Sequence, residues 1–320
     1  MRTLNIAHRG FHLYVPENTV DAFHAAVRVG ADGIETDVQL TRDGQLVVHH
    51  NYTIDACSNG HGAISDMTLS QLRRYLRVDR NGKECSHTYI PTLEECLRAC
   101  EALKLVNIEL KAPVDRTLPY VERVVEAVSA SGCTQRVVVS AFDHRLLSQV
   151  KTLNPKLRVG VLTMPIGFVN SPSFRLLCKH LPYGKSLLEV RASDMMDVPA
   201  DALGPNTVDI PGAGPASVIA ELAHQIGAVY PDCTLTQAAE LLSAQDNLVE
   251  YISGLDFKAD YIHCHYSTLL HSPEIIPKLA QMGILCSPWT PDRLDELKVL
   301  TRLGCYSIIT NRPDLLRTLL

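Results

Sequence analysis

Short apolar runs alternate with longer segments whose apolar residues recur every three or four positions along most of the chain. The short runs are typical of buried strands, and the longer segments are typical of helices with one face on a core. The predicted strands are residues 4–7, 33–38, 105–110, 136–139, 157–162, 261–264, 284–286 and 306–309. The predicted helices are residues 20–29, 92–103, 119–130, 144–152, 273–282, 291–303 and 312–319, and Thr92 with Glu95 predicts a capping box.

Repeated units of a strand followed by a helix predict a parallel sheet covered by helices. Eight units favour a closed (β/α)8 barrel of the TIM type, an α/β fold, over an open doubly wound sheet. A further apolar run at 46–48 predicts a hairpin beside the second strand. A chain of 320 residues is long enough for one large barrel or for two smaller domains. We predict a single barrel domain over residues 1–320.

Two segments interrupt this repeat. Residues 51–91 are polar and rich in turn residues, which predicts a small excursion after the second strand. Residues 165–257 are rich in proline and carry amphipathic patches at 216–226 and 236–242, which predicts a longer helical insert before the sixth strand. Long connections usually carry function or an interface. One interpretation makes this insert an oligomerisation arm of a homo-oligomer.

The composition is that of an ordinary globular protein, with 46% apolar and 20% charged residues. The net charge is −5 and no basic tract is present, which argues against a nucleic-acid partner. No apolar run reaches the roughly 18 residues that a transmembrane segment needs. The first strand begins almost at the N-terminus, which leaves no room for a secretory leader and predicts a cytoplasmic location. Several of the 10 cysteines lie inside apolar runs and none forms a CxxC pair, so in a chain of this size they are expected to be reduced and mostly buried.

Carboxylates lie at the ends of two consecutive predicted barrel strands. Glu35 and Asp37 are two residues apart and share a face, and Glu109 is followed at the same spacing by Lys111. Three carboxylates at one barrel mouth would repel one another unless a cation lay between them, and Mg²⁺ and Ca²⁺ prefer such oxygen ligands. A solvated charged face is the alternative. The recurrence at two strand ends favours a site for one divalent cation, Mg²⁺ or Ca²⁺.

Two imidazoles and two cations accompany these acids. His8 ends the first strand and His50 ends the hairpin strand. Although each His alone is more often structural, a pair can supply a general base and a general acid near neutral pH. Arg9 and Lys111 provide positive charge for a phosphodiester. The set favours phosphoryl chemistry over sugar hydrolysis, for which two carboxylates suffice.

A third group of possible ligands is the run His263-Cys264-His265. Alternation along a strand places the two His on one face and the Cys on the other. We therefore interpret these residues as structural and keep a zinc site only as the lesser alternative.

Several motifs in this order resemble the glycerophosphodiester phosphodiesterase family. They include His-Arg-Gly at 8–10, Pro-Glu-Asn-Thr at 16–19, Glu-Thr-Asp-Val at 35–38, Val-Val-His-His at 47–50, Asn-Ile-Glu-Leu-Lys at 107–111 and Trp-Thr at 289–290. The resemblance spans residues 3–163 and 259–318. It implies a (β/α)8 barrel that hydrolyses glycerophosphodiesters to an alcohol and glycerol 3-phosphate with one divalent cation.

The same resemblance implies a role for each motif residue. His8 and His50 resemble the acid–base pair, and Glu35, Asp37 and Glu109 resemble the metal ligands. Arg9 and Lys111 resemble the phosphate contacts. Trp289 resembles the aromatic residue that lines the glycerol end of the pocket, with a place in the core as the alternative. The chain departs from the family pattern at Asn51 and Asn311, where Asp is frequent, and at Asp292, where Asn is common. Substrate preference is therefore less secure than the chemistry.

Two other functions remain open. One is a related enzyme of the lysophospholipase D type, or one acting on another phosphodiester, for which the insert would have to build an apolar channel. The other is a barrel that binds a phosphoester without cleaving it. The paired His8 and His50 argue against that binder, because binding alone needs no proton carriers.

Overall fold

The computed structural model describes residues 2–79, 81–171, 174, 177, 190–197 and 215–320. The chain forms two compact units. One comprises Met1–Thr163 with Ile252–Leu320, and the other comprises Met164–Tyr251.

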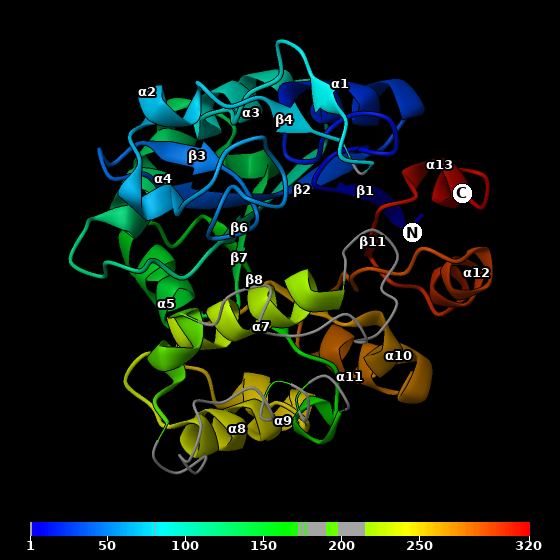
Figure 1. Ribbon diagram of the computed structural model, residues 1–320. Helices are drawn as coiled ribbons and strands as arrows, with labels where there is room; N and C mark the ends of the chain where they lie inside the picture. The colour runs from blue at the N-terminus through cyan, green and yellow to red at the C-terminus, as the bar shows by residue number, and fades with distance from the viewer. Residues whose placement is uncertain (1, 80, 172–173, 175–176, 178–189, 198–214) are drawn as a thin grey trace. The chain divides into compact units, whose positions relative to one another are not determined.

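The first unit is an eight-stranded parallel barrel (Figure 1). Its strands are β1 (Leu4–His8), β2 (Gly33–Leu40), β6 (Leu105–Leu110), β7 (Val137–Ala141), β8 (Arg158–Thr163), β9 (Tyr261–Cys264), β10 (Leu285–Cys286) and β11 (Ser307–Thr310). They pair in the order β10-β9-β8-β7-β6-β2-β1-β11. The backbone N–H of Tyr306 donates to the carbonyl of Cys286 at 2.9 Å, and that of Ile309 donates to Pro288 at 3.0 Å. These bonds join the two edge strands, so the predicted barrel is confirmed.

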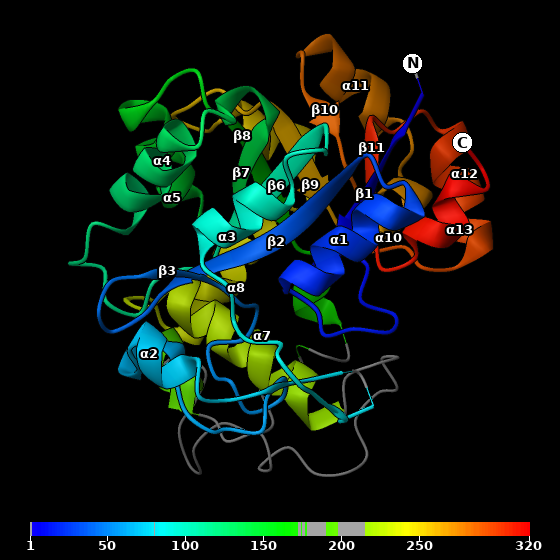
Figure 2. The same cartoon turned by 90° about the horizontal axis from the view of Figure 1, so that it is seen from above.

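Helices lie on the outside of these strands (Figure 2). They are α1 (Val20–Val29), α3 (Leu93–Ala99), α4 (Tyr120–Ala130), α5 (His144–Leu153), α10 (Tyr266–His271), α11 (Ile275–Gln281), α12 (Leu294–Arg302) and α13 (Pro313–Arg317). The capping box of Thr92 and Glu95 is present, as predicted. The helix predicted from residue 291 begins three residues later, at Leu294, where the side chain of Glu296 accepts from the backbone N–H of Arg293 at 3.3 Å. The six-residue α10 was not predicted, since it is too short to show a helical repeat.

Side chains inside the barrel change from apolar to polar toward the carboxyl ends of the strands. On β6, Leu105 belongs to an apolar cluster with Ile6 and Tyr261. Two residues further on, Nδ2 of Asn107 lies 3.3 Å from Nδ1 of His263. The next inward position is Glu109. The barrel therefore presents its ionisable groups at the mouth where its strands end.

The excursion after the second strand is confirmed. The strand β3 (Leu46–Val48) pairs antiparallel with β2, and the chain then forms η1 (Ile64–Asp66), α2 (Leu69–Leu72), β4 (Arg77–Val78) and β5 (Glu84–Cys85) before α3. A small apolar cluster holds this segment together and consists of Val47, Ile54, Ile64, Leu72 and Ile90.

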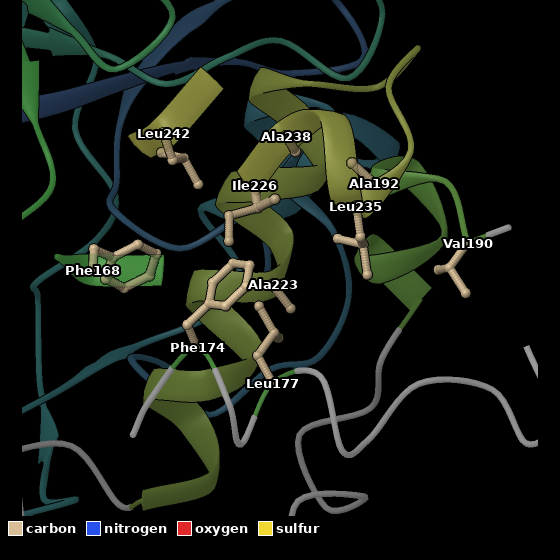
Figure 3. Packing of buried hydrophobic residues seen from close by; sticks show 10 residues of the cluster. All are labelled: Phe168, Phe174, Leu177, Val190, Ala192, Ala223, Ile226, Leu235, Ala238 and Leu242. Carbon is tan, nitrogen blue, oxygen red and sulfur yellow. The ribbon is translucent and has the colours of Figure 1, made fainter. Parts of the chain in front are cut away.

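The second unit contains η3 (Phe168–Asn170), η4 (Ala192–Asp197), α7 (Pro215–Val229), α8 (Leu235–Ala244) and the start of α9 (Leu248–Ser253). It has its own apolar core, built from Phe168, Phe174, Leu177, Val190, Ala192, Ala223, Ile226, Leu235, Ala238 and Leu242 (Figure 3). The helices α7 and α8 confirm the helical patches predicted at 216–226 and 236–242. The parts of the predicted insert at 172–173, 175–176, 178–189 and 198–214 lie outside the described residues.

Two expectations from composition concern the whole described chain. None of its described helices combines the length and hydropathy that crossing a bilayer requires. The nine cysteines within the described residues carry free thiols, and six of them are buried.

Candidate active site

Three carboxylates meet at the mouth of the barrel. The register of β2 and β6 places Asp37 beside Glu109, and Glu35 faces the same interior from β2. One ligand oxygen from each residue lies within 4.8 Å of the others, and all three side chains belong to buried residues. Among the described residues this is the group whose donor atoms could hold a metal ion. Its all-oxygen chemistry fits a hard divalent cation such as Mg²⁺ or Ca²⁺.

Burial disfavours the ionised form of all three carboxylates. Burial raises the pKa of Glu35 well above its usual value, and the neighbouring Asp37 and Glu109 raise it further. Burial also raises the pKa of Glu109. For Asp37 burial acts in the same direction, but Lys111 and other nearby positive groups hold its pKa below the usual value. Its buried Oδ1 is held by the ion pair with Lys111, and an oxygen with this charge is of the kind that can coordinate a cation.

Two cationic side chains contact the cluster. Nζ of Lys111 lies 2.8 Å from Oε1 of Glu109 and 3.3 Å from Oδ1 of Asp37. The backbone N–H of Arg9 donates to Oε2 of Glu35 at 3.2 Å, and its guanidinium donates to Oε1 of Glu17 at 2.9 Å. The structure therefore places Arg9 and Lys111 beside the carboxylates, and their contact with a phosphate stays a prediction.

Both predicted proton carriers lie beside asparagine oxygens. Nδ1 of His8 lies 2.7 Å from Oδ1 of Asn311, and its Nε2 lies 3.7 Å from Oε2 of Glu35. Nδ1 of His50 lies 2.7 Å from Oδ1 of Asn51. Burial and then Arg9 lower the pKa of His8 to about 3 and hold the pKa of His50 well below its usual value. Both rings are therefore neutral at pH 7 in this arrangement.

Asn18 has a larger role than the sequence indicated. Asn18 and Thr19 end the Pro-Glu-Asn-Thr motif that precedes the first helix. Thr19 does cap α1, because its Oγ1 accepts from the N–H of Ala22 at 3.2 Å. The buried Asn18 also donates from Nδ2 to Oδ2 of Asp37 at 2.8 Å and accepts from Thr36 at 2.7 Å. It thereby fixes the orientation of a predicted metal ligand.

Arg77 was not predicted, and it connects the excursion to two loops of the site. Its side chain is fully buried. Nη2 donates to the carbonyl of Glu17 at 2.9 Å, and Nη1 lies at the same distance from Nδ1 of His49. An arginine in a short polar segment carries no sequence signal for this role, because both partners come from other parts of the chain.

Replacing Arg77 by Leu is expected to lower the free energy of unfolding by about 2 kcal/mol, since it leaves the buried His49 nitrogen and the Glu17 carbonyl without a donor. Chemical denaturation measures this change. The exposed Arg74 nearby offers the matched control Arg74→Leu, which should leave the midpoint unchanged. Equal stability of the two variants would contradict the role of Arg77 as a buried link.

Trp289 lies at the end of β10, on the same barrel mouth. Its Nε1 donates to the carbonyl of His263 at 2.9 Å. Its ring meets Phe142 and His265 edge to face, with ring centroids 5.8 Å and 5.1 Å apart. The ring is packed on these neighbours but is only partly buried. Its contact with the glycerol end of a substrate remains a prediction.

A parallel barrel with carboxylates, imidazoles and cations at one mouth defines the class of barrel hydrolases that act on phosphate esters. Residues 8–167 match the model of the glycerophosphoryl diester phosphodiesterase family. A glycerophosphodiester phosphodiesterase of Caldanaerobacter subterraneus is 41% identical over 99% of this chain and 97% of its own. One from Bacillus subtilis is 30% identical over 98% of this chain and 85% of its own. The chain therefore belongs to the glycerophosphoryl diester phosphodiesterase family and is a phosphoric diester hydrolase.

Solved structures share the fold. A phosphodiesterase from Oleispira antarctica, in complex with the product sn-glycerol-3-phosphate, has a TM-score of 0.62 at 18% identity and covers 99% of this chain and 96% of its own. A glycerophosphodiester phosphodiesterase from Thermotoga maritima has a TM-score of 0.60 at 20% identity, with full coverage of both chains. At these identities the similarity supports the barrel architecture.

Proposed function

We propose that this protein hydrolyses glycerophosphodiesters to an alcohol and glycerol 3-phosphate with the help of one divalent cation. The observation that carries the proposal is the buried cluster of Glu35, Asp37 and Glu109, whose oxygens lie within 4.8 Å of one another at the barrel mouth. A small-molecule glycerophosphodiester is the proposed substrate.

Each site residue has a proposed role. Glu35, Asp37 and Glu109 would hold the cation, Mg²⁺ or Ca²⁺, which when bound polarises phosphoryl oxygens and acidifies a nearby hydroxyl. Arg9 and Lys111, which lie beside Asp37, would contact the phosphate of the substrate. Their positive charges would pair with its negatively charged oxygens. Trp289 lines the glycerol end of the pocket.

The imidazoles of His8 and His50 carry out the proton transfers in this proposal. The attacking hydroxyl, from water or from the glycerol moiety, gives its proton to one ring while its oxygen forms a bond to phosphorus. The bond from phosphorus to the leaving oxygen breaks, and the other ring protonates that oxygen. Attack by water gives glycerol 3-phosphate directly, whereas attack by the glycerol hydroxyl gives a cyclic glycerol phosphate that a water molecule must open in a second step. His8 and His50 are both neutral at pH 7 in the described arrangement, so either can accept the first proton, and the second step requires one of them to be protonated.

Product analysis tests this function. The purified full chain, supplied with Mg²⁺ or Ca²⁺, should release equal amounts of glycerol 3-phosphate and alcohol from glycerophosphocholine, glycerophosphoethanolamine or glycerophosphoglycerol. A long-acyl lysophospholipid, assayed in parallel, distinguishes the lysophospholipase D type. Binding of these esters without any product would identify a non-catalytic barrel and overturn the proposal.

The remaining proposals concern organisation. We infer a cytoplasmic location, which the free thiols of the described cysteines support, and a single barrel domain that carries residues 165–257 as an insert. We also propose that this insert forms a homo-oligomer contact. Sedimentation of the full chain over a range of concentrations tests that contact, and a purely monomeric chain would contradict it.

A further inference from the structure

Asp292 and Asn311 form a polar pair in the loops that follow β10 and β11. Oδ1 of Asp292 accepts from Thr310 Oγ1 at 3.0 Å and from the backbone N–H of Asn311 at 2.9 Å. Its Oδ2 accepts from Nδ2 of Asn311 at 2.7 Å. Because an ionised carboxylate can only accept hydrogen bonds, the amide nitrogen of Asn311 must face Asp292. The orientation of the amide is therefore fixed.

The opposite side of the same amide faces two histidines. Oδ1 of Asn311 lies 2.7 Å from Nδ1 of His8 and 3.0 Å from Nε2 of His12. A carbonyl oxygen has no proton to give, so each of these ring nitrogens must carry the hydrogen. In neutral His8 the lone pair is then on Nε2, the atom that lies 3.7 Å from Oε2 of Glu35. That distance is too long for a hydrogen bond.

We propose that Asp292 and Asn311 are positioning residues that keep hydrogen on Nδ1 of His8, so that His8 exchanges its catalytic proton only through Nε2. The proposal rests on the proposed function in one respect, the role of His8 as a proton carrier. It holds whether His8 is the general base or the general acid, because Nδ1 is an N–H in both the neutral and the charged ring.

The same pair accounts for two departures of the chain from its family pattern. Asn311 stands where Asp is frequent, and Asp292 stands where Asn is common. The structure brings the two side chains into direct contact, so one carboxylate and one amide are still paired, with their positions exchanged. A paired exchange of this kind suggests a matched experiment in which the two residues are changed singly and together.

The single variant Asp292→Asn is expected to rotate the side-chain amide of Asn311 by about 180°, so that its oxygen and nitrogen exchange places. The new amide at position 292 keeps its oxygen toward the Thr310 hydroxyl and the backbone N–H of Asn311, both of which donate, so its nitrogen faces the Asn311 side chain. Two amide nitrogens cannot donate to each other, so Asn311 would present its oxygen to position 292 and its nitrogen to His8, which then must carry hydrogen on Nε2. We expect kcat to fall about tenfold to hundredfold, the usual cost of losing a group that orients a functional imidazole. KM should stay within about twofold, because neither residue is proposed to contact substrate.

The double variant Asp292→Asn with Asn311→Asp should restore the orientation. The amide at 292 can still accept from Thr310 and the backbone, while its nitrogen donates to the new carboxylate, whose second oxygen accepts from His8. We expect kcat to recover to within about threefold of the wild type. Asp295→Asn is the matched control, since the Asp295 side chain is 67% exposed and pairs with Arg293, and it should behave as wild type.

A spectroscopic signature separates orientation from general damage. The ¹⁵N NMR spectrum of protein with labelled histidines reports the tautomer of each ring, and the His8 signals are the ones that His8→Gln removes. His8 should be the Nδ1–H tautomer in the wild type and in the double variant. It should be the Nε2–H tautomer in Asp292→Asn. An Nε2–H tautomer in the wild type would overturn the proposal. So would wild-type kcat in Asp292→Asn, or a double variant no better than that single one.

Failure of the proposed function would look different. If the wild type released no glycerol 3-phosphate, or if His8→Gln kept full activity, the proton-carrier role of His8 would be lost. The tautomer measured in the wild type would still decide whether Asp292 and Asn311 orient the ring.

Discussion

Dialysis against EDTA is expected to abolish glycerol 3-phosphate release, and added Mg²⁺ or Ca²⁺ should restore it. The physical reason is the crowding of three buried carboxylates, in which burial and mutual repulsion raise the pKa of Glu35 and Glu109 although Lys111 and Arg9 lie beside them. A cation that binds the folded chain also stabilises it by mass action, by about 2.7 kcal/mol when its concentration is 100 times its Kd. Thermal unfolding with and without each ion therefore gives a readout that does not depend on turnover.

Two glutamate variants test whether the cation binds at the carboxylate cluster. Glu109→Gln removes a ligand charge from the cluster, so activity should fall by at least ~10²-fold and the rise in Tm on adding the cation should disappear. Glu101→Gln changes an exposed residue at the end of the neighbouring α3 segment, and it should keep both the activity and the rise in Tm. Activity that survives complete chelation, confirmed by elemental analysis, would contradict metal dependence.

The carboxylate cluster could be predicted from sequence because it depends on local regularities. Glu35 and Asp37 share a face of one strand, and Glu109 ends the next barrel strand, so strand alternation and parallel pairing are enough to bring them together. The same reasoning predicted the strands, since each is a short apolar run between helical patterns. Helix ends were less accurate, as the later start of α12 shows, because a capping residue decides the end and the apolar repeat does not.

The residues that orient the cluster could not be predicted in this way. Asn18 reaches Asp37 from a loop, and Asn311 reaches His8 across 303 positions of sequence. These contacts depend on where loops lie after the barrel has closed, and loop residues have no periodicity that would report their neighbours. The family resemblance marked Asn311 and Asp292 only as departures, and their contact became visible in the structure.

Replacing either His8 or His50 by Gln is expected to lower kcat by at least ~10²-fold with a smaller change in KM, because each ring is proposed to move a proton in the transition state. Gln keeps a polar side chain of similar length but does not titrate. His24→Gln is the control, since His24 is exposed on α1, and it should retain wild-type kinetics. Circular dichroism and Tm should match across the three variants. A variant of His8 or His50 that kept wild-type kcat would exclude that ring from proton transfer.

A substrate with an acidic leaving group can then assign the two roles. In a glycerophosphodiester of p-nitrophenol, the leaving oxygen departs as a stable anion and needs no proton, so the general acid becomes dispensable while the general base does not. The variant that lacks the acid should therefore recover most of its activity on this ester, and the variant that lacks the base should stay inactive. Nε2 of His8 lies 3.7 Å from Oε2 of Glu35, so His8 is beside the proposed cation site in either role. Recovery of both variants to the same extent would contradict a division of labour between His8 and His50.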